Sequence, residues 1–472
     1  MIGLNIDRHA PGSYIYQQVY QQLKEAVLKN QLAPHEQLPA KRSLAAELNV
    51  SLNSVNAAYQ QLIAEGFIYS IERQGYFAED LEYTVDTEHQ VPSLPEDLQE
   101  DTHSKMDVSF SHMQVDTEEF PLKKWLKCEQ QALYNFTSLH KQYGDPKGIY
   151  ELRASIAQLI AFNRGVRAHP EQIILGAGTQ ELMRTLTRLL PEETAYGLEE
   201  PGYQRVYQLL KQEKRNVITL PLDDKGIQAE GLRHYKPDVL FTTPSHQFPT
   251  GVIMPASRRM QLLNWASENP GRYIIEDDYD SEYKYDTDSI PSLQSLDRHE
   301  QVIYMGTFSK SLMPGLRLSY MVLPVQLIRS YQKMQPTFIQ SCSTIQQISL
   351  KLFIDEGHYL RHTKRMKQVY KDKREACVAA FENVFGDNVT ISGAKSGLHF
   401  VAAFRTEKTE AAIIAEAATQ NIEVYSLSRF ELESSTSHKR DPTLIIGFAG
   451  LHSEEMHPAV QALYKVIYDT HA

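Results

Sequence analysis

The sequence predicts an α/β protein in which a small domain of helices and a hairpin precedes a larger domain with a mostly parallel sheet. In residues 1–78, apolar residues recur at helical spacing and then alternate as in a two-strand hairpin. Residues 79–106 are acidic, contain prolines and lack an apolar period, which is typical of a linker. In residues 107–472, short apolar strands alternate with amphipathic helical segments, the pattern of a parallel sheet covered by helices. The clearest strands are expected at 172–178, 238–244, 272–278 and 301–307.

The composition excludes several classes of protein. The chain of 472 residues carries a formal net charge of −11, which argues against a protein that coats nucleic acid without regard to sequence. Its three cysteines, Cys128, Cys342 and Cys377, are far apart, so we expect neither a metal site nor a disulfide framework. The first residues do not resemble a secretory signal, and no apolar stretch approaches the roughly 20 residues that span a bilayer. We therefore expect a cytoplasmic protein without a membrane partner.

The first domain contains a helix-turn-helix pattern. Residues 17–30 place apolar side chains on one helical face, and residues 44–48 do the same for a second, shorter helix. A turn at 49–50 is followed by Ser51, which is placed to cap a third helix with a polar start. Such a helix can present its first side chains to the major groove of DNA. Residues 68–78 then predict a hairpin, although the spacing alone also fits a small helical cap.

The run LPAKRSLAAELNVSLNSVNAAYQQLIAEG at 38–66 resembles the winged helix of GntR-type regulators almost position by position. The resemblance implies a DNA-binding domain whose third helix enters the major groove. Two positions depart from the family pattern: Ala40 replaces the usual serine, and Leu52 replaces an arginine that is expected to touch DNA. Arginines are expected at phosphates, and polar residues at the helix start are expected at base edges. The candidates for DNA contact are Lys41, Arg42, Ser51, Asn53, Ser54, Asn56 and Arg73.

The charge of this head limits what a single copy can do. Residues 1–80 hold six basic and eight acidic side chains, a net charge of −2. Because DNA affinity depends strongly on neutralising phosphates, one head should bind weakly. We therefore expect a dimer that binds paired half-sites in DNA, with the cations of each head gathered on one face.

The run TFSKSLMPGLRLSY (307–320) places a lysine between hydroxyl side chains and an arginine that follows a Pro-Gly loop. Pyridoxal phosphate (PLP) requires a lysine for its covalent attachment and polar or basic groups close by for its phosphate. By itself the pattern is weak evidence, since most lysines are solvated surface residues. The candidates in this run are Thr307, Ser309, Lys310 and Arg317.

Three segments upstream strengthen this interpretation. Asp277 lies at the end of an apolar strand, where a carboxylate can pair with the pyridine nitrogen of PLP, and Tyr279 could donate to the ring 3-oxygen. Tyr203, in EEPGYQRVY, could stack on the ring face. The run ILGAGTQELM joins a strand to a helix start, whose amides and dipole suit a phosphate. Each fragment has a structural alternative, but together they predict a PLP site. The helix-start candidates are Gly178, Thr179 and Gln180.

The order of these motifs resembles class I aminotransferases of fold type I, from YGDPKGIYELR (143–153) to SKSLMPGLR (309–317). With the GntR-like head, the whole chain resembles the MocR/GabR group of regulators, and its GabR-type members in particular. The resemblance implies a large domain with a mostly parallel sheet, a smaller C-terminal α/β domain, and PLP attached to Lys310. It also implies a homodimer with exchanged heads and an amino-acid-like effector, with 4-aminobutyrate (GABA) favoured. The effector-binding residues implied are His112, Arg205 and Arg429.

One position departs from ordinary aminotransferases. They usually carry an asparagine before Pro-Thr-Gly that bonds the PLP 3-oxygen, whereas Phe248 occupies that place in TPSHQFPTG (243–251). Losing this donor does not prevent attachment of PLP to Lys310, but it changes the electronics of the cofactor and the shape of the pocket. The GabR-type relatives share the SHQFP run, so the departure fits a site that keeps its cofactor and has altered chemistry.

The leading hypothesis is therefore a PLP-dependent transcription regulator. An amine effector would form an external aldimine with PLP, and its preference for one domain arrangement would change DNA binding or promoter activation. The alternative is a working aminotransferase whose N-terminal head only assists assembly. A dedicated enzyme needs no recognition helix or wing, which favours a regulator with at most vestigial turnover. For the effector, a different amino acid or a dipeptide remains an alternative to GABA.

Overall fold

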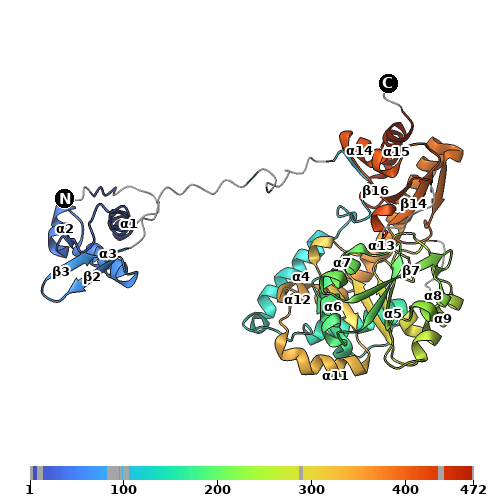
Figure 1. The fold of residues 1–472 in the computed structure, drawn as a ribbon, viewed down its shortest axis with the longest axis horizontal. Helices are drawn as coiled ribbons and strands as arrows, with labels where there is room; N and C mark the ends of the chain where they lie inside the picture. The colour runs from blue at the N-terminus through green and yellow to red at the C-terminus, as the bar shows by residue number, and fades with distance from the viewer. Residues whose placement is uncertain are drawn as a thin grey trace. The chain divides into compact units, whose positions relative to one another are not determined.

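The computed structural model describes residues 4–7, 14–81, 95, 98, 106–285, 291–433 and 441–469. The chain divides into two compact units, Met1–His103 and Ser104–Ala472 (Figure 1). Most of the predicted linker at 79–106 lies outside the described residues. In the described ranges, no helix is long and apolar enough to cross a membrane.

The N-terminal unit packs three helices against a small antiparallel sheet. The helices are α1 (Ile15–Leu28), α2 (Lys41–Glu47) and α3 (Leu52–Ala64), and the strands follow the order β1 (Gln37–Leu38), β3 (Gly75–Ala78), β2 (Ile68–Ile71). The predicted helix-turn-helix and hairpin are confirmed. The third strand, β1, was not predicted, because two residues are too short to show an alternating pattern. The centre of its core holds fully buried side chains of α1 and α3: Val19, Leu23, Val55, Ala58, Tyr59 and Leu62.

The turn before α3 has the predicted capping geometry. Asn49 takes a left-handed backbone conformation with φ 51°, which an asparagine tolerates better than most residues. Ser51 then accepts a 3.1 Å hydrogen bond from the Ser54 amide through its hydroxyl, so one free amide at the start of α3 is satisfied. The cap fixes where the exposed first turn of α3 begins.

The second unit is built on an eight-stranded sheet with the order β5-β12-β11-β10-β9-β6-β7-β8. The five strands from β11 to β7 run parallel, whereas β12 is antiparallel to both of its neighbours and β8 is antiparallel to β7. The predicted mostly parallel sheet is therefore confirmed, and all four expected strands are present. The bounds are β5 (Ile173–Gly176), β6 (Ala195–Glu200), β7 (Asn216–Asp223), β8 (Gly226–Ile227), β9 (Val239–Thr242), β10 (Tyr273–Asp278), β11 (Val302–Thr307) and β12 (Ser319–Val322).

Helices cover both faces of this sheet. Successive strand residues point to opposite faces, so Ile173 and Leu175 pack with α4, α5 and α12, whereas Ile174 packs with α6, α7 and α11. The first face continues over α8 and α9, which bury Leu240 and Ile274. The helix bounds are α4 (Leu122–Asn135), α5 (Tyr150–Arg164), α6 (Thr179–Leu189), α7 (Gln204–Gln212), α8 (Ala229–Tyr235), α9 (Ala256–Ser267), α10 (Leu293–Leu296), α11 (Val325–Met334) and α12 (Thr344–Asp355).

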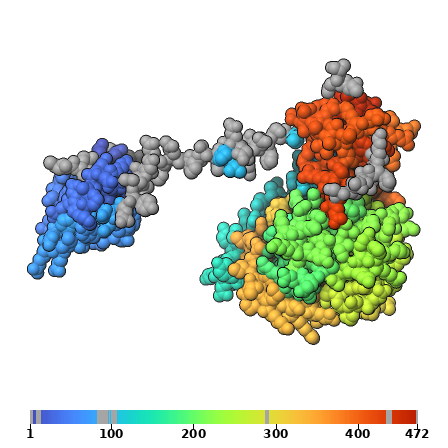
Figure 2. All heavy atoms as spheres, in the orientation of Figure 1, coloured from blue at the N-terminus to red at the C-terminus, as the bar shows by residue number. Residues whose placement is uncertain are grey.

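A smaller C-terminal layer completes the unit. Its antiparallel sheet has the order β13-β14-β17-β16, and a short parallel pair joins β15 to β4. Figure 2 shows this layer, in orange and red, packed on the green part of the larger sheet domain. The bounds are β4 (Val108–Ser109), α13 (His358–Phe385), β13 (Val389–Ser392), β14 (His399–Phe404), α14 (Glu410–Thr419), β15 (Ile422–Glu423), β16 (Tyr425–Ser426), β17 (Thr443–Gly447) and α15 (Ser453–Tyr468).

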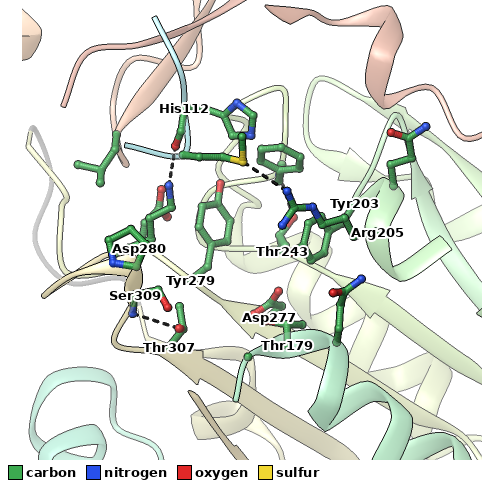
Figure 3. Close-up of a pocket in the computed structure, with 18 of the residues that line it drawn as sticks. His112, Thr179, Tyr203, Arg205, Thr243, Asp277, Tyr279, Asp280, Thr307 and Ser309 are labelled. Carbon is green, nitrogen blue, oxygen red and sulfur yellow. Dashed lines mark hydrogen bonds between the residues drawn. The ribbon is translucent and has the colours of Figure 1, made fainter. Parts of the chain in front are cut away.

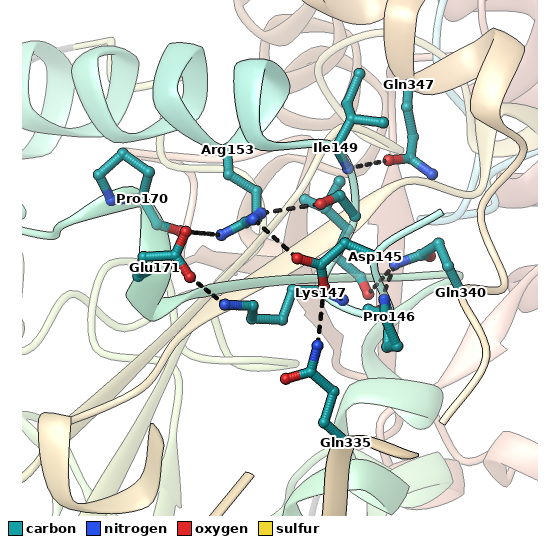
Figure 4. Close-up of polar contacts among 12 residues, drawn as sticks. Asp145, Pro146, Lys147, Ile149, Arg153, Pro170, Glu171, Gln335, Gln340 and Gln347 are labelled. Carbon is teal, nitrogen blue, oxygen red and sulfur yellow. Dashed lines mark hydrogen bonds and ion pairs between the residues drawn. The ribbon is translucent and has the colours of Figure 1, made fainter. Parts of the chain in front are cut away.

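The loop before α5 is fixed by a buried arginine (Figure 4). Arg153 is 1% exposed and donates to the Gly148 carbonyl at 3.0 Å and to the Pro170 carbonyl at 2.8 Å. Lys147 pairs with Glu171, and its carbonyl accepts from the Leu175 amide at 2.9 Å. These contacts hold the end of β5, and with it the turn that leads into α6.

Candidate cofactor and effector site

The candidate residues lie where strands of the large sheet end. The carboxyl ends of β10 and β11 carry Asp277 and lead to Lys310, and the end of β6 leads to Tyr203. Strand β5 points the same way as β11, since both are antiparallel to β12, so the turn at Gly178 reaches the same edge. Ligands of open α/β sheets bind at this edge, because neighbouring loops leave a crevice there.

A cavity of about 290 Å³ opens at this edge (Figure 3). Its volume is close to the lower end of the range for small-molecule pockets, which is about 300 to 1,000 Å³. The structure brings every predicted cofactor and effector residue to its wall. These residues are His112, Gly178, Thr179, Gln180, Tyr203, Arg205, Asp277, Tyr279, Thr307, Ser309, Lys310, Arg317 and Arg429.

Lys310 lines the cavity and is not a solvated surface lysine. Its ammonium donates to the His112 carbonyl at 2.5 Å. Burial lowers the pKa of Lys310 to about 8, and the charge of Asp280 opposes this shift. With this pKa, about a tenth of the amine is uncharged at pH 7, and an uncharged amine is the form that attacks a carbonyl carbon.

Asp277 lies opposite, deep in the cavity wall. The side chain is 4% exposed, and its Oδ1 has no hydrogen-bond partner among the described residues. Burial, and then the charges of Asp278 and Asp280, raises the pKa of Asp277 to about 7. A buried carboxylate oxygen without a donor is costly, and a protonated pyridine nitrogen is a group that would satisfy it.

The aromatic residues form the walls between these two groups. Tyr203 stacks on Phe241 with the ring centroids 6.4 Å apart, and it meets Phe248 edge-on at 5.9 Å. The Tyr279 hydroxyl donates to the His246 carbonyl at 3.0 Å. Phe248, where aminotransferases usually carry asparagine, is 8% exposed and packs on the rings of His112, Tyr279 and Phe430.

The turn into α6 forms an anion cradle with Arg317. Gly178 has φ 113°, and a Cβ at that position would lie 2.5 Å from the nearest Arg317 guanidinium nitrogen. Only glycine therefore lets the guanidinium approach the free amides at the start of α6. Arg317 also donates to the Ala177 carbonyl at 2.8 Å, and Thr307 accepts from the Ser309 amide at 3.1 Å. Amides, hydroxyls and a guanidinium are the groups that a phosphate requires.

The predicted effector residues line the opposite part of the cavity. Arg205 has one guanidinium nitrogen 3.5 Å from the Met113 sulfur, and Arg429 lies 4.7 Å from the centroid of the Tyr425 ring. Within the part of the chain that the structure describes, neither forms an ion pair with a carboxylate. Burial and the charges of Lys310, Arg429 and Arg205 lower the pKa of His112 to about 3, so His112 is neutral. The pocket thus presents two cations that are free to bind an anion.

Sequence reasoning missed several residues of the wall. Thr243 directly follows β9, and Asp280 lies two residues after the end of β10, so their positions near strand ends were an available signal. His399, Tyr425 and Phe430 come from the C-terminal layer, and only the packing of that layer on the large sheet brings them here. Local sequence patterns carry no information about that contact.

The predicted DNA-contact residues gather on the helix-turn-helix and the wing. Arg42, Ser51, Asn53, Asn56 and Arg73 are exposed. The half-buried residues are Ser54, whose hydroxyl lies 2.8 Å from that of Ser51, and Lys41, which donates to Asn56 at 2.8 Å. Leu52 is 44% exposed on the first turn of α3.

Each of the two units matches a known protein family. Residues 15–77 match the bacterial regulatory proteins of the gntR family, and residues 103–463 match aminotransferase class I and II. The HTH-type regulator YdeL of Bacillus subtilis is 36% identical over 95% of this chain and 96% of its own. The probable rhizopine catabolism regulatory protein MocR of Rhizobium meliloti is 30% identical over 98% of this chain and 95% of its own. The chain belongs to the MocR-type family of transcription regulators.

The larger unit of this MocR-type regulator also matches solved enzymes. The α-aminoadipate aminotransferase LysN of Thermus thermophilus, solved with N-(5'-phosphopyridoxyl)-L-leucine, has a TM-score of 0.68 and 26% identity, with 76% of this chain and 91% of that chain covered. The cofactor of the MocR-type regulator is pyridoxal phosphate, and its gntR-type head binds DNA. The fold-type I architecture predicted from the sequence is confirmed.

The raised pKa of Asp277 predicts how cofactor-free protein responds to pH. The folded chain holds this proton more tightly than the unfolded chain, so the carboxyl favours folding at low pH. Its contribution to the free energy of unfolding should fall as the pH rises from about 4 to about 7 and then stay constant. Thermal unfolding of the cofactor-free protein at several pH values measures this.

Asp277→Asn is the matched control, because asparagine has a similar shape and no proton to exchange. The difference in unfolding temperature between the variant and the native chain should change with pH in the cofactor-free state. A difference that is constant between about pH 4 and pH 8 would contradict the assignment of this titration to Asp277.

Proposed function

We propose that this regulator senses a small amino acid in the cavity and transmits its presence to the DNA-binding heads. The observation that carries the proposal is the division of the cavity wall. Lys310, Asp277 and the Arg317 cradle match the amine, pyridine and phosphate needs of the cofactor, whereas Arg205 and Arg429 have no carboxylate partner among the described residues. Two further guanidinium groups suit the carboxylate of an amine effector.

The residue roles follow from this division. Lys310 would hold PLP, Asp277 would face the pyridine nitrogen, and Tyr279 would turn its hydroxyl from the His246 carbonyl to the 3-oxygen. Tyr203 would cover one ring face, with Gly178, Thr179, Gln180, Thr307, Ser309 and Arg317 around the phosphate. The effector amine would take the place of the Lys310 amine at the cofactor, while its carboxylate binds Arg205 and Arg429 beside His112.

We favour GABA as the effector, because its amine and carboxylate lie at opposite ends of a flexible chain. The resemblance to GabR-type regulators supports the same choice. A different amino acid or a dipeptide would use the same two ends of the pocket. Titration of the holo-protein with GABA, β-alanine, alanine and alanyl-alanine, followed by cofactor absorbance, ranks these compounds.

The titration also separates regulation from catalysis. A sensor should change its spectrum on binding the amine and then release little keto product. Turnover of an amine with a keto acid at more than about 1 per second, the lower end of ordinary enzyme rates, would favour the aminotransferase alternative. Phe248 supports the sensor, because it replaces the usual hydrogen-bond donor near the ring with a buried apolar side chain.

DNA binding is proposed to require two heads. Each head has a small number of exposed cations on α2 and the wing, so a homodimer with exchanged heads on paired half-sites would supply the missing affinity. Size measurement of the holo-protein by light scattering tests the dimer. A binding footprint with two protected segments about one helical turn or a multiple of it apart tests the half-sites.

Arg42→Ala should weaken DNA binding without altering sequence preference, because an exposed arginine at the start of α2 is placed for phosphate. Loss of one contact in each of two heads should lower the slope of log affinity against log salt by about 1.8. Leu52→Arg should act in the opposite direction, since it adds a cation on the first turn of α3. Gel shifts with the region upstream of the gene, at several salt concentrations, measure both.

Lys29→Ala is a suitable control for Arg42→Ala. Lys29 directly follows α1 and lies outside α2, α3 and the hairpin, and its ammonium is 3.4 Å from Glu25. The control should leave the salt slope unchanged. An equal loss of affinity in the two variants would mean that Arg42 acts only through the overall charge of the head.

A further inference from the structure

The cavity wall contains a second acidic side chain, Asp280. The proposed function gives it no role in binding the cofactor or the effector. Asp280 is 1% exposed and lines the cavity near Lys310, whose ammonium it favours. In Figure 3, Asp280 and Arg205 lie on opposite sides of Tyr279. Among the described residues of the wall, Asp277 and Asp280 are the two acids, and Asp277 is placed for the ring nitrogen.

The Asp280 carboxylate is held in one orientation. The Nδ1 of His246 lies 2.8 Å from Asp280 Oδ2, and the His246 ring is itself buried. Gly397, with φ 72°, closes over this pair, and a Cβ there would lie 2.3 Å from Asp280 Oδ2 and 2.2 Å from the His246 ring. A side chain at residue 397 would therefore displace the pair, so the close packing fixes the carboxylate.

The neighbouring histidine, His399, is neutral. Burial, and then the proximity of His246, lowers the pKa of His399 well below its usual value, and its Nε2 lies 3.1 Å from the Pro249 carbonyl. Among the described residues, the titratable groups that interact with Asp280 include Lys310, His246, Asp277, Tyr279, Tyr283 and Tyr285, and a ring nitrogen of His399 lies within 4.8 Å of its carboxylate. Lys310 is the cation among them.

We infer that Asp280, oriented by His246, binds the ammonium of the incoming effector and accepts its proton. The inference rests on the proposed function. In it, Asp280 binds the cationic end of the effector, whereas Arg205 and Arg429 bind the anionic end. An effector amine arrives at neutral pH as an ammonium, which has no lone pair for attack. A fixed carboxylate in the wall of the same cavity can remove that proton, as a general base does.

Protons and bonds balance in this step. The ammonium gives one proton to the Asp280 carboxylate as its nitrogen forms a bond to the cofactor carbon that Lys310 occupies. The other two protons of the effector nitrogen, and the one held by Asp280, pass to the Lys310 nitrogen as both of its bonds to that carbon break. The effector nitrogen takes over the double bond, and Lys310 leaves as an ammonium with three protons. No proton is gained or lost overall, and no co-reactant is needed.

Two small amines of different basicity test the inference on the holo-protein. Methylamine is an ammonium at neutral pH and has no carboxylate, so its reaction does not depend on Arg205 or Arg429. Methoxyamine is uncharged at neutral pH and needs no base before it attacks. Stopped-flow absorbance of the cofactor gives the rate constant with each amine.

Asp280→Asn should slow the reaction with methylamine about a hundredfold and change that with methoxyamine less than about threefold. The methylamine rate of the variant should rise about tenfold per pH unit, because only the free amine then reacts. His246→Gln keeps Asp280 but loosens it, so a smaller loss, again confined to methylamine, is expected. The cofactor band of each variant before mixing shows that it is folded and loaded.

Equal slowing with both amines would mean that Asp280 only shapes the pocket, and it would overturn the inference. Unchanged rates in Asp280→Asn would also overturn it. If the native holo-protein gave no spectral change with either amine, the cofactor would not be exchangeable at Lys310. The proposed function would then fail, and this inference with it.

Discussion

Lys310→Ala is expected to abolish covalent attachment of the cofactor and, with it, the response of DNA binding to an amine. Among the described residues that line the cavity, Lys310 is the one lysine, and burial lowers its pKa to about 8. Without that amine, PLP can be held only through its phosphate and ring contacts. Absorbance of the holo-protein, and the mass of the chain after borohydride reduction, measure the attachment.

Two variants make the result specific. Lys310→Arg keeps a cation in the pocket but offers no amine that can form the bond, so it should behave like Lys310→Ala. Lys284 is buried and its pKa is likewise lowered to about 8, but it does not line the cavity. Lys284→Gln should therefore keep the attached cofactor. A reduced, cofactor-bearing mass in Lys310→Ala would place the attachment on another lysine.

Arg205→Gln and Arg429→Gln are expected to have the second large effect, confined to effectors with a carboxylate. A charge-assisted hydrogen bond contributes about 1.5–3 kcal/mol, so each variant should weaken GABA binding by about ten- to a hundredfold. Butylamine resembles GABA without the carboxylate, and its affinity should change less than about threefold. Titration of cofactor absorbance gives both affinities.

Arg233→Gln supplies the control, because this arginine of α8 is exposed and pairs with Glu268 at 3.6 Å. It should leave both affinities unchanged. If the Arg205 and Arg429 variants weakened butylamine as much as GABA, the guanidinium groups would be supporting the pocket wall. The assignment of the carboxylate to them would then be wrong.

These predictions rest on residues that local sequence patterns place in the site. Asp277 is recognisable because it ends an apolar strand, and Gly178 because it joins such a strand to a helix start. Carboxyl ends of parallel strands meet at one edge of a sheet, so the two motifs are expected to lie close together. The same reasoning applies to Asp280, which follows the same strand as Asp277.

The DNA-binding head was predictable for a related reason. Its helices, turn and wing are contiguous in sequence, and a serine cap with an apolar period defines α3 locally. The contact of Lys41 with Asn56 was not predictable, because it depends on how α2 crosses α3. Both residues are candidates for DNA contact, and the structure shows that their side chains are hydrogen-bonded to each other.

The sequence by itself determined the two-unit organisation and the mostly parallel sheet, and it predicted the lysine, acid and glycine of the proposed cofactor site, since a local pattern indicates each of them. Tertiary structure alone decided what surrounds them. His399, Tyr425 and Phe430 reach the cavity because the C-terminal layer packs on the strand ends, and Gly397 closes over Asp280 and His246 for the same reason. Contacts between segments more than a hundred residues apart depend on the packing of whole layers, which no local pattern records.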